Sequence, residues 1–185
     1  WLWVDLCLCL VAAFLLDGAV LDLVRPWQGT HVTELVHQVI RPLGVGHTQV
    51  LVVLALLAVG LWRPAARRAA GRVALALASS ALCVNVLKAL VHRPRPWVEA
   101  PHLASWWAAV QYSARESELR SFPSAESATT FAVVWTLIGL YPRARVPLLI
   151  AAVLVAAGRV VVGAHHPSDV VAGAMLGIAL GQVAL

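Results

Sequence analysis

The chain has 185 residues, of which 61% are hydrophobic and only 12% are charged, and its mean hydropathy is +0.81. A soluble domain of this length would be about 45–50% apolar and about 25% charged. The composition therefore excludes an ordinary soluble domain and predicts an integral membrane protein. We expect a single domain, residues 1–185, because helices in lipid must satisfy one another's backbones and polar groups.

The formal net charge is +5, from 14 Lys and Arg against 9 Asp and Glu. In a membrane protein such an excess of cations sets the orientation of the spans, and it also suits a site for an anion. The cysteines Cys7, Cys9 and Cys83 are odd in number and lie in apolar runs. We interpret them as small buried hydrophobic residues, not as a disulfide framework or a metal site.

Six stretches are apolar enough to cross a bilayer, each near the ~20 residues that a spanning helix needs. They are residues 1–23, 48–62, 72–91, 124–141, 146–163 and 168–185. This pattern predicts an all-α bundle of six transmembrane helices. The first stretch begins at Trp1 and lacks the basic start and the cleavage site of a signal peptide, so we interpret it as a spanning helix and leave the true N-terminus open. We expect Asp17, within it, to face the bundle interior or water, unless the helix ends near an interface there.

Two connecting segments predict helices that lie on the membrane surface. Residues 30–42 carry apolar side chains at helical spacing, with polar ones mostly on the other side, as in an interfacial amphipathic helix. Residues 92–123 form the longest polar region and are rich in tryptophan, which prefers the headgroup layer. We expect a helix at about residues 103–112 there; the alternative is a solvated connector whose tryptophans act only as anchors.

Arginine is concentrated in two short loops, between the second and third spans and between the fourth and fifth: Arg63, Arg67, Arg68, Arg72, Arg143 and Arg145. Short loops rich in Lys and Arg stay in the cytoplasm. We therefore predict that these loops and, with six spans, both termini are cytoplasmic. The ends of the first, third and fifth spans then meet on the extracytoplasmic side.

The most informative stretch joins the fifth and sixth spans and contains Arg159, His165 and Asp169. Ionisable groups at membrane depth are costly, which makes them candidates for function. His165 and Asp169 are four residues apart, so the carboxylate can hold one imidazole nitrogen and leave the other free to attack. Arg159 supplies a planar fork suited to phosphate oxygens. The alternative is a helix cap, in which Ser168 or Asp169 caps the last helix and the histidines lie at the interface.

Two further segments reach the same side of the membrane. Lys88 and Arg95 close the third span and are seven residues apart, about two helical turns, so they can share one face. The alternative is that these cations merely snorkel at a helix end. Ser124 opens the fourth span as a candidate N-cap, and the free N–H groups behind it, with the helix dipole, favour an anion. A serine cap is common, so this last signal is weak by itself.

Together the three segments resemble the type 2 phosphatidic acid phosphatase (PAP2) family, whose pattern is K-x6-R-P, then P-S-G-H, then S-R-x5-H-x3-D. The resemblance covers essentially the whole chain. Its first and third motifs are present here, with Gly158 in place of the serine, as Lys88, Arg95, Pro96, Arg159, His165 and Asp169.

The resemblance implies a membrane phosphatase that needs no metal or other cofactor. His165 would attack phosphorus to form a phosphohistidine, Asp169 would orient it, and water would hydrolyse the intermediate. The phosphate would be held by Lys88, Arg95, Ser124, Ala125 and Arg159. The family shares its site with vanadium haloperoxidases. Those enzymes are soluble, whereas the composition of this chain predicts a membrane protein, which disfavours a haloperoxidase.

The second motif departs from the family. The chain reads P-S-A-E from residue 123, and in the family the final His is the general acid that protonates the leaving oxygen. A protonated Glu126 can donate a proton, but the matching positions surround it with cations. We expect an anionic Glu126 paired with Arg95, Arg159 or Lys88, which would weaken the enzyme. The site is then either altered or engineered, or a natural variant that uses a carboxylic acid.

The sequence thus predicts a membrane phosphatase that acts on a lipid phosphate or diphosphate at the extracytoplasmic face. Its partners would be the lipid substrate and the membrane, with no nucleic acid. Two alternatives use the same site: a non-catalytic binder of lipid phosphates that has lost the acid, and a phosphotransferase in which a hydroxyl replaces water. The oligomeric state stays open, as does the choice among phosphatidate, phosphatidylglycerol phosphate, polyprenyl diphosphates and lipid A phosphates.

Overall fold

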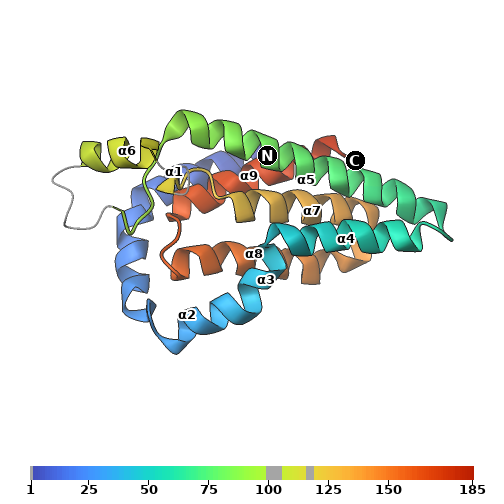
Figure 1. Ribbon diagram of the computed structural model, residues 1–185, viewed down its shortest axis with the longest axis horizontal. Coiled ribbons are helices and arrows are strands. Elements are labelled where there is room, and N and C mark those ends of the chain that lie inside the picture. Colours follow the sequence, from blue (N-terminus) through green and yellow to red (C-terminus); the bar gives the residue numbers. More distant parts are fainter. Residues whose placement is uncertain (1, 99–105, 116–118) are drawn as a thin grey trace.

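The computed structural model describes residues 2–98, 106–115 and 119–185, and within these ranges the chain is almost entirely helical. Most of the long helices run side by side along one axis (Figure 1). The predicted all-α fold is confirmed. The helices are α1 (Leu2–Val24), α2 (His31–Leu35), α3 (Arg41–Gly44), α4 (Gly46–Val59), α5 (Pro64–Val91), α6 (Trp106–Arg115), α7 (Ala125–Leu140), α8 (Arg145–Val161) and α9 (Pro167–Val183), with the short turns η1 (Arg25–Trp27), η2 (Val36–Ile40) and η4 (Pro142–Ala144).

Each predicted span corresponds to one long helix: α1, α4, α5, α7, α8 and α9. Among the described residues, three helical stretches are long and apolar enough to cross a membrane: Trp3–Trp27, Pro64–Val91 and Pro142–Val161. A fourth exists if His31–Gly44 and Gly46–Val59, bent by 40°, form one broken span, and α7 and α9 are shorter apolar helices. The count of six spans therefore stays a prediction.

The contact between α7 and α9 is the most extensive between any two of the described elements. Gly173, Gly177 and Gly181 follow one another at every fourth position of α9 and face α7. A Cβ atom at Gly177 would collide with the Ala128 carbonyl oxygen, and one at Gly173 would lie 2.6 Å from that of Ser124. Glycine therefore lets the two backbones approach closely, as small residues do between membrane helices.

The helix α1 exposes large apolar side chains, among them Leu8 and Leu15. In a bilayer such a surface would contact lipid tails. Cys7 and Cys9 are exposed on the same helix, so the prediction that they are buried is wrong; α1 turns most of its surface outward. Asp17 is buried together with Ala13 and Val24 of the same helix; it is only 8% exposed and faces the bundle as predicted.

The predicted amphipathic segment, residues 30–42, is helical from His31 onward, after the N-cap Thr30, and runs from α2 through the π-helical turn η2 into α3. Val36 is buried. A Cβ atom at Gly158 of α8 would lie 2.9 Å from Val36 Cγ1 and 3.5 Å from Ile40 Cγ2. The absence of a side chain at Gly158 therefore lets this segment pack directly on α8.

The tryptophan-rich region contains α6, which confirms most of the helix predicted at residues 103–112; the start of that range, before Trp106, lies outside the described residues. After α6 the chain returns to the bundle by an isolated antiparallel bridge. The Arg95 N–H donates to the Leu119 carbonyl oxygen at 3.0 Å, and the Ser121 N–H donates to that of Arg93 at 2.7 Å. This pairing fixes the backbone that follows α5.

Candidate functional site

The three sequence motifs meet at one end of the bundle (Figure 1). Lys88 lies in the last turn of α5 and Arg159 in the last turn of α8. The helices α7 and α9 begin there, so Glu126 and Asp169 lie in first turns. The site is therefore built from helix ends, whose positions are set by the packing of α7 on its neighbours α5, α8 and α9.

The loop between α8 and α9 positions His165. Gly163 has a φ of 70°, a left-handed conformation that favours glycine, and it ends α8. The His165 N–H then donates to the Arg159 carbonyl oxygen at 3.2 Å. His166 caps α9, and its N–H donates to the Asp169 carboxylate at 2.8 Å. Held between two helix ends, the His165 side chain is only 4% exposed.

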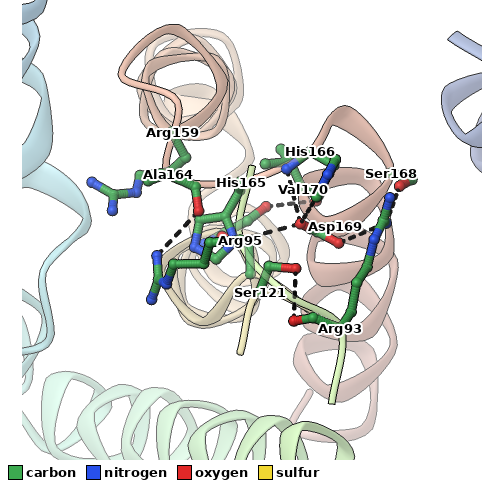
Figure 2. Close-up of polar contacts among 12 residues, drawn as sticks. Arg93, Arg95, Ser121, Arg159, Ala164, His165, His166, Ser168, Asp169 and Val170 are labelled. Atoms are coloured by element: carbon green, nitrogen blue, oxygen red, sulfur yellow. Dashed lines mark hydrogen bonds and ion pairs between the residues drawn. The ribbon is translucent and has the colours of Figure 1, made fainter. Parts of the chain in front are cut away.

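Asp169 faces both histidines (Figure 2). Its Oδ2 atom lies 3.7 Å from His165 Nδ1 and 3.1 Å from His166 Nδ1. The expected contact between Asp169 and His165 is present, but it is longer than a hydrogen bond, and His166 is the closer partner. The helix-cap alternative is also present, because the Asp169 carboxylate and the His166 backbone form a capping box. One carboxylate therefore caps α9 and faces His165.

Burial governs the protonation state of His165. Removal of the imidazole from water lowers the pKa of His165 to about 4; the cations Arg95 and Lys88 act in the same direction, and Asp169 acts against them. The imidazole is therefore neutral at pH 7. In that form its lone pair is available for nucleophilic attack.

Three cations from separate segments gather around His165. The Lys88 ammonium lies within electrostatic range of Arg95 and Arg159, and it donates to a backbone carbonyl oxygen at 3.0 Å. Arg95 Nη1 donates to a carbonyl oxygen of the loop between α8 and α9 at 3.1 Å. In the view of Figure 2, the guanidinium groups of Arg95 and Arg159 lie on the same side of His165. Like charges held this close favour the binding of an anion between them.

Arg159 has buried N–H groups that make no hydrogen bond within the described chain. Its side chain is 10% exposed, and within the described residues its Nε and Nη1 atoms have no hydrogen-bond partner. Glu126 Oε2 lies 3.2 Å from Nε as an ion pair, but a buried charged donor without a hydrogen bond is costly. A tetrahedral anion with several acceptor oxygens, such as a phosphate, would satisfy them.

Glu126 lies between two arginines. Its Oε2 atom is 3.2 Å from Arg159 Nε, and its Oε1 atom is 3.7 Å from Arg41 Nε. The contact with Arg159 is one of the expected pairings, whereas Arg41, from α3, is not among the cations that the motifs indicate. Ser124 is the N-cap of α7 as expected, because its hydroxyl accepts from the Ser127 N–H at 3.4 Å. The Glu126 carboxylate therefore lies against a cation that a bound phosphate would need.

Residues 69–185 match the family model described as PAP2 superfamily. The chain belongs to the PAP2 superfamily. Two curated relatives, each named lipid A 1-phosphatase, come from Rhizobium johnstonii and Rhizobium etli. The chain is 38% identical to the first and 37% to the second over 98 residues, which is 53% of this chain but only 39% and 41% of the relatives. The chain thus aligns with about two fifths of the length of these relatives.

Two solved structures have a fold similar to that of this chain. One is the first transmembrane PAP2-type phosphatidylglycerolphosphate phosphatase from Bacillus subtilis, with a TM-score of 0.74 and 21% identity over 98% of this chain and 92% of that one. The other is Aquifex aeolicus LpxE, with a TM-score of 0.71 and 22% identity over 91% of this chain and 94% of that one. The likeness extends to the N-terminal helices, which the family model does not cover.

Two charged residues outside the PAP2 motifs join the site. Arg93 Nη1 donates to Asp169 Oδ1 at 2.9 Å, and Arg93 Nη2 donates to Asp17 Oδ2 at 2.7 Å. The Ser168 N–H donates to Asp17 Oδ1 at 2.9 Å. The sequence predicts an inward-facing Asp17 but not these partners, and the only signal for Arg93 is its place next to Arg95 in a basic run.

Proposed function

We propose that this PAP2 chain, as a single domain over residues 1–185, is a membrane phosphatase that removes phosphate from a lipid phosphate or diphosphate. The observation that carries the proposal is the surroundings of His165. The His165 imidazole, whose pKa is lowered by burial, faces a carboxylate, and the buried Arg159 beside it has N–H groups without hydrogen-bond partners. This arrangement suits a phosphate held by Lys and Arg side chains next to a nucleophile.

The proposed reaction has two displacements. His165 Nε2 attacks phosphorus, so that a P–N bond forms as the P–O bond to the lipid breaks. The leaving oxygen takes a proton from Glu126, which must be protonated for this role. Water then attacks the phosphohistidine, the P–N bond breaks, and the proton of the water returns to the carboxylate. Asp169 would orient the imidazole, and the phosphate oxygens would be held by Lys88, Arg95, Arg159 and the start of α7 at Ser124 and Ala125.

The relatives suggest which substrates to test first. Curated relatives act, by name, on the 1-phosphate of lipid A, and one structural neighbour acts on phosphatidylglycerol phosphate. A lipid tail would remain in the bilayer beside the exposed apolar helices, with the headgroup at the end of the bundle that holds His165. We place this end on the extracytoplasmic side, because the arginines that predict a cytoplasmic location lie at the opposite end, in the two turns there and in the first part of α5 and α8.

Glu126 would weaken this enzyme. An ion-paired carboxylate has no proton to give, and here it lies 3.2 Å from a nitrogen of Arg159. Before phosphate can bind Arg159 fully, Glu126 must move away or take up a proton. A neutral or cationic side chain at this position would remove the competition.

Replacement of position 126 tests the proposal. We expect Glu126→His to raise turnover by the ~10²–10⁴-fold typical of general acid–base catalysis. Glu126→Gln removes the negative charge but supplies no acid, so it should bind phosphate more tightly than the parent without the rate of the His variant. The measurement is phosphate release by purified protein from phosphatidate, phosphatidylglycerol phosphate, a polyprenyl diphosphate and a lipid A phosphate.

His165→Ala is the control for that series and should abolish phosphate release in every background, because it removes the nucleophile. Release that survives this change, in a preparation free of host phosphatases, would contradict the mechanism. A Glu126→His variant slower than the parent would instead identify Glu126 as an effective catalytic acid.

A second candidate is a non-catalytic binder of lipid phosphates. The contact between Glu126 and Arg159 favours it, because the position of the general acid is occupied by an ion-paired carboxylate. Binding of a lipid phosphate by the parent, with no release of phosphate from any lipid in the panel, would establish the binder. Release that His165→Ala abolishes would exclude it.

A further inference from the structure

A buried charge network links α1 to the start of α9. Arg93 lies between two carboxylates, donating to Asp17 Oδ2 at 2.7 Å and to Asp169 Oδ1 at 2.9 Å. Ser168 connects the same groups: its N–H and its hydroxyl donate to the Asp17 carboxylate at 2.9 and 2.5 Å. Arg93 Nη1 also donates to the Ser168 hydroxyl oxygen at 2.6 Å. Four side chains from three distant segments thus form one connected unit.

The network is almost closed to water. The side chains of Asp17, Arg93 and Asp169 are 11%, 17% and 0% exposed. The ring of Phe14, one turn before Asp17, lies over Arg93, with 5.3 Å between its centroid and the guanidinium carbon, as in a cation–π contact. In such surroundings an ion pair keeps its geometry, and loss of one partner leaves a buried charge without compensation.

The two oxygens of Asp169 have different partners. Arg93 binds Oδ1, and Oδ2 accepts from the His166 N–H at 2.8 Å and lies 3.7 Å from His165 Nδ1. Figure 2 shows Arg93 and the histidines on different sides of the carboxylate. The hydrogen bond from Arg93 to Oδ1 therefore keeps Oδ2 directed toward the histidines. The hydrogen bond from Arg93 to Asp17 in turn fixes the position of the Arg93 guanidinium.

We infer that Asp17 and Arg93 are positioning residues, which hold the Asp169 carboxylate toward His165 and so make α1 a part of the site. This inference rests on the proposed phosphatase function. Asp17 lies outside residues 69–185, which match the PAP2 family model. Of the three aspartates of α1, Asp5 and Asp22 are exposed and only Asp17 is buried.

The alternative role of the network is to anchor α1, whose surface is otherwise largely exposed, to the bundle. An anchor would affect the stability of the fold and leave the turnover of folded protein unchanged. A positioning role would lower kcat in protein that is folded, because the imidazole loses its oriented carboxylate. Neither residue would contact the phosphate, so KM and the inhibition constant of inorganic phosphate should stay at the parental values.

The test compares Asp17→Asn and Arg93→Lys with the parent and with Asp22→Asn, a control on the exposed side of the same helix. We expect kcat to fall by ~10–100-fold in Asp17→Asn, as is usual when an outer partner of a reacting group is lost. Arg93→Lys should also lower kcat, because one ammonium cannot bind both carboxylates as the guanidinium does. Asp22→Asn should match the parent.

Histidine ring ¹⁵N NMR supplies a readout that needs no turnover, with signals assigned through His165→Gln and His166→Gln. The Nδ1 signal of His166, which faces Asp169 at 3.1 Å, should shift in Asp17→Asn and Arg93→Lys and stay in place in Asp22→Asn.

A parent that releases no phosphate contradicts the proposed function, and these shifts alone then decide the inference. A folded Asp17→Asn variant with the parental kcat, or with an unshifted His166 signal, would overturn the positioning role of Asp17 and Arg93. Loss of folding in both variants, including the conservative Arg93→Lys, would make the network an anchor and overturn it too.

Discussion

The burial of the His165 imidazole makes the stability of this protein depend on pH. The pKa of His165 is about 4 in the folded chain, against an ordinary value of 6.5. Between these values the unfolded chain binds a proton that the folded chain excludes, so unfolding becomes easier as the pH falls. The contribution of this histidine to stability is therefore complete above about pH 6.5 and is lost progressively towards about pH 4.

His165→Gln removes this titration. We expect the parent to lose about 1.4 kcal/mol more stability than the variant for each pH unit within that window. Thermal unfolding in detergent, at one scan rate and from about pH 7 down to about pH 5, measures the difference. His31→Gln is the matched control, because the His31 side chain is fully exposed, and it should follow the parent. Equal losses for the parent and His165→Gln would show that His165 is not held neutral by burial.

At the scale of elements, the stripe of glycines on α9 fixes the distance between the two helices that begin at the site. Cβ atoms added to this stripe would lie against α7 backbone atoms from Ser124 to Thr136. A wider spacing would move the start of α9, with Asp169, away from the start of α7, with Glu126. The packing of two apolar helices thus sets the geometry of polar groups at their ends.

Gly177→Ala should therefore reduce both stability and activity. Its Cβ atom would collide with the Ala128 carbonyl oxygen and would lie 2.8 Å from the Ala132 nitrogen, and neither backbone can turn away as a side chain would. We expect a loss of ~1–3 kcal/mol, the usual cost of overpacking, seen as a lower midpoint of thermal unfolding. Gly71→Ala in α5 is the control, because nothing lies within 4 Å of the added atom; it should be neutral or stabilising. A parental midpoint for Gly177→Ala would show that the helices do not depend on this close contact.

At the scale of the whole molecule, the two ends of the bundle differ in their charged groups. At one end lie the last turns of α5 and α8 and the first turns of α7 and α9, which carry the carboxylates and cations of the site. At the other end lie the turn between α4 and α5 and the turn η4 (Figure 1). The arginines that predict a cytoplasmic location lie in these turns (Arg63 and Arg143) or in the first part of the helices that follow them, α5 (Arg67, Arg68 and Arg72) and α8 (Arg145). A bilayer across the bundle would therefore place His165 and the arginine-rich turns on opposite sides.

Single cysteines at exposed positions test this orientation. In a background without Cys7, Cys9 and Cys83, we expect His31→Cys to react with a membrane-impermeant maleimide in intact spheroplasts. Ala65→Cys, at the exposed start of α5, should react only after the membrane is permeabilised. The reverse pattern would put the site on the cytoplasmic face and change the lipids available to it.

The sequence by itself determined the helices and the motif residues. Long apolar stretches can satisfy their backbone in lipid only as helices, so α1, α4, α7, α8 and α9 fall close to the predicted ranges; α5 starts earlier, at Pro64, because proline fits a first helical turn. The spacing of Arg159, His165 and Asp169 needs only the local geometry of one loop. Together with the other two segments, it identified the family correctly.

Only the tertiary structure decided which side chains meet across the bundle. Asp17 and Ser168 are 151 residues apart, and no local pattern relates them. Arg41 approaches Glu126 because α3 packs near α7, and His166 lies closer to Asp169 than His165 does because the α9 capping box turns its ring inward. Hydropathy and helical periodicity are local properties of the sequence. Contacts between side chains of different helices depend instead on the spacing of the helix backbones, and here glycines set that spacing.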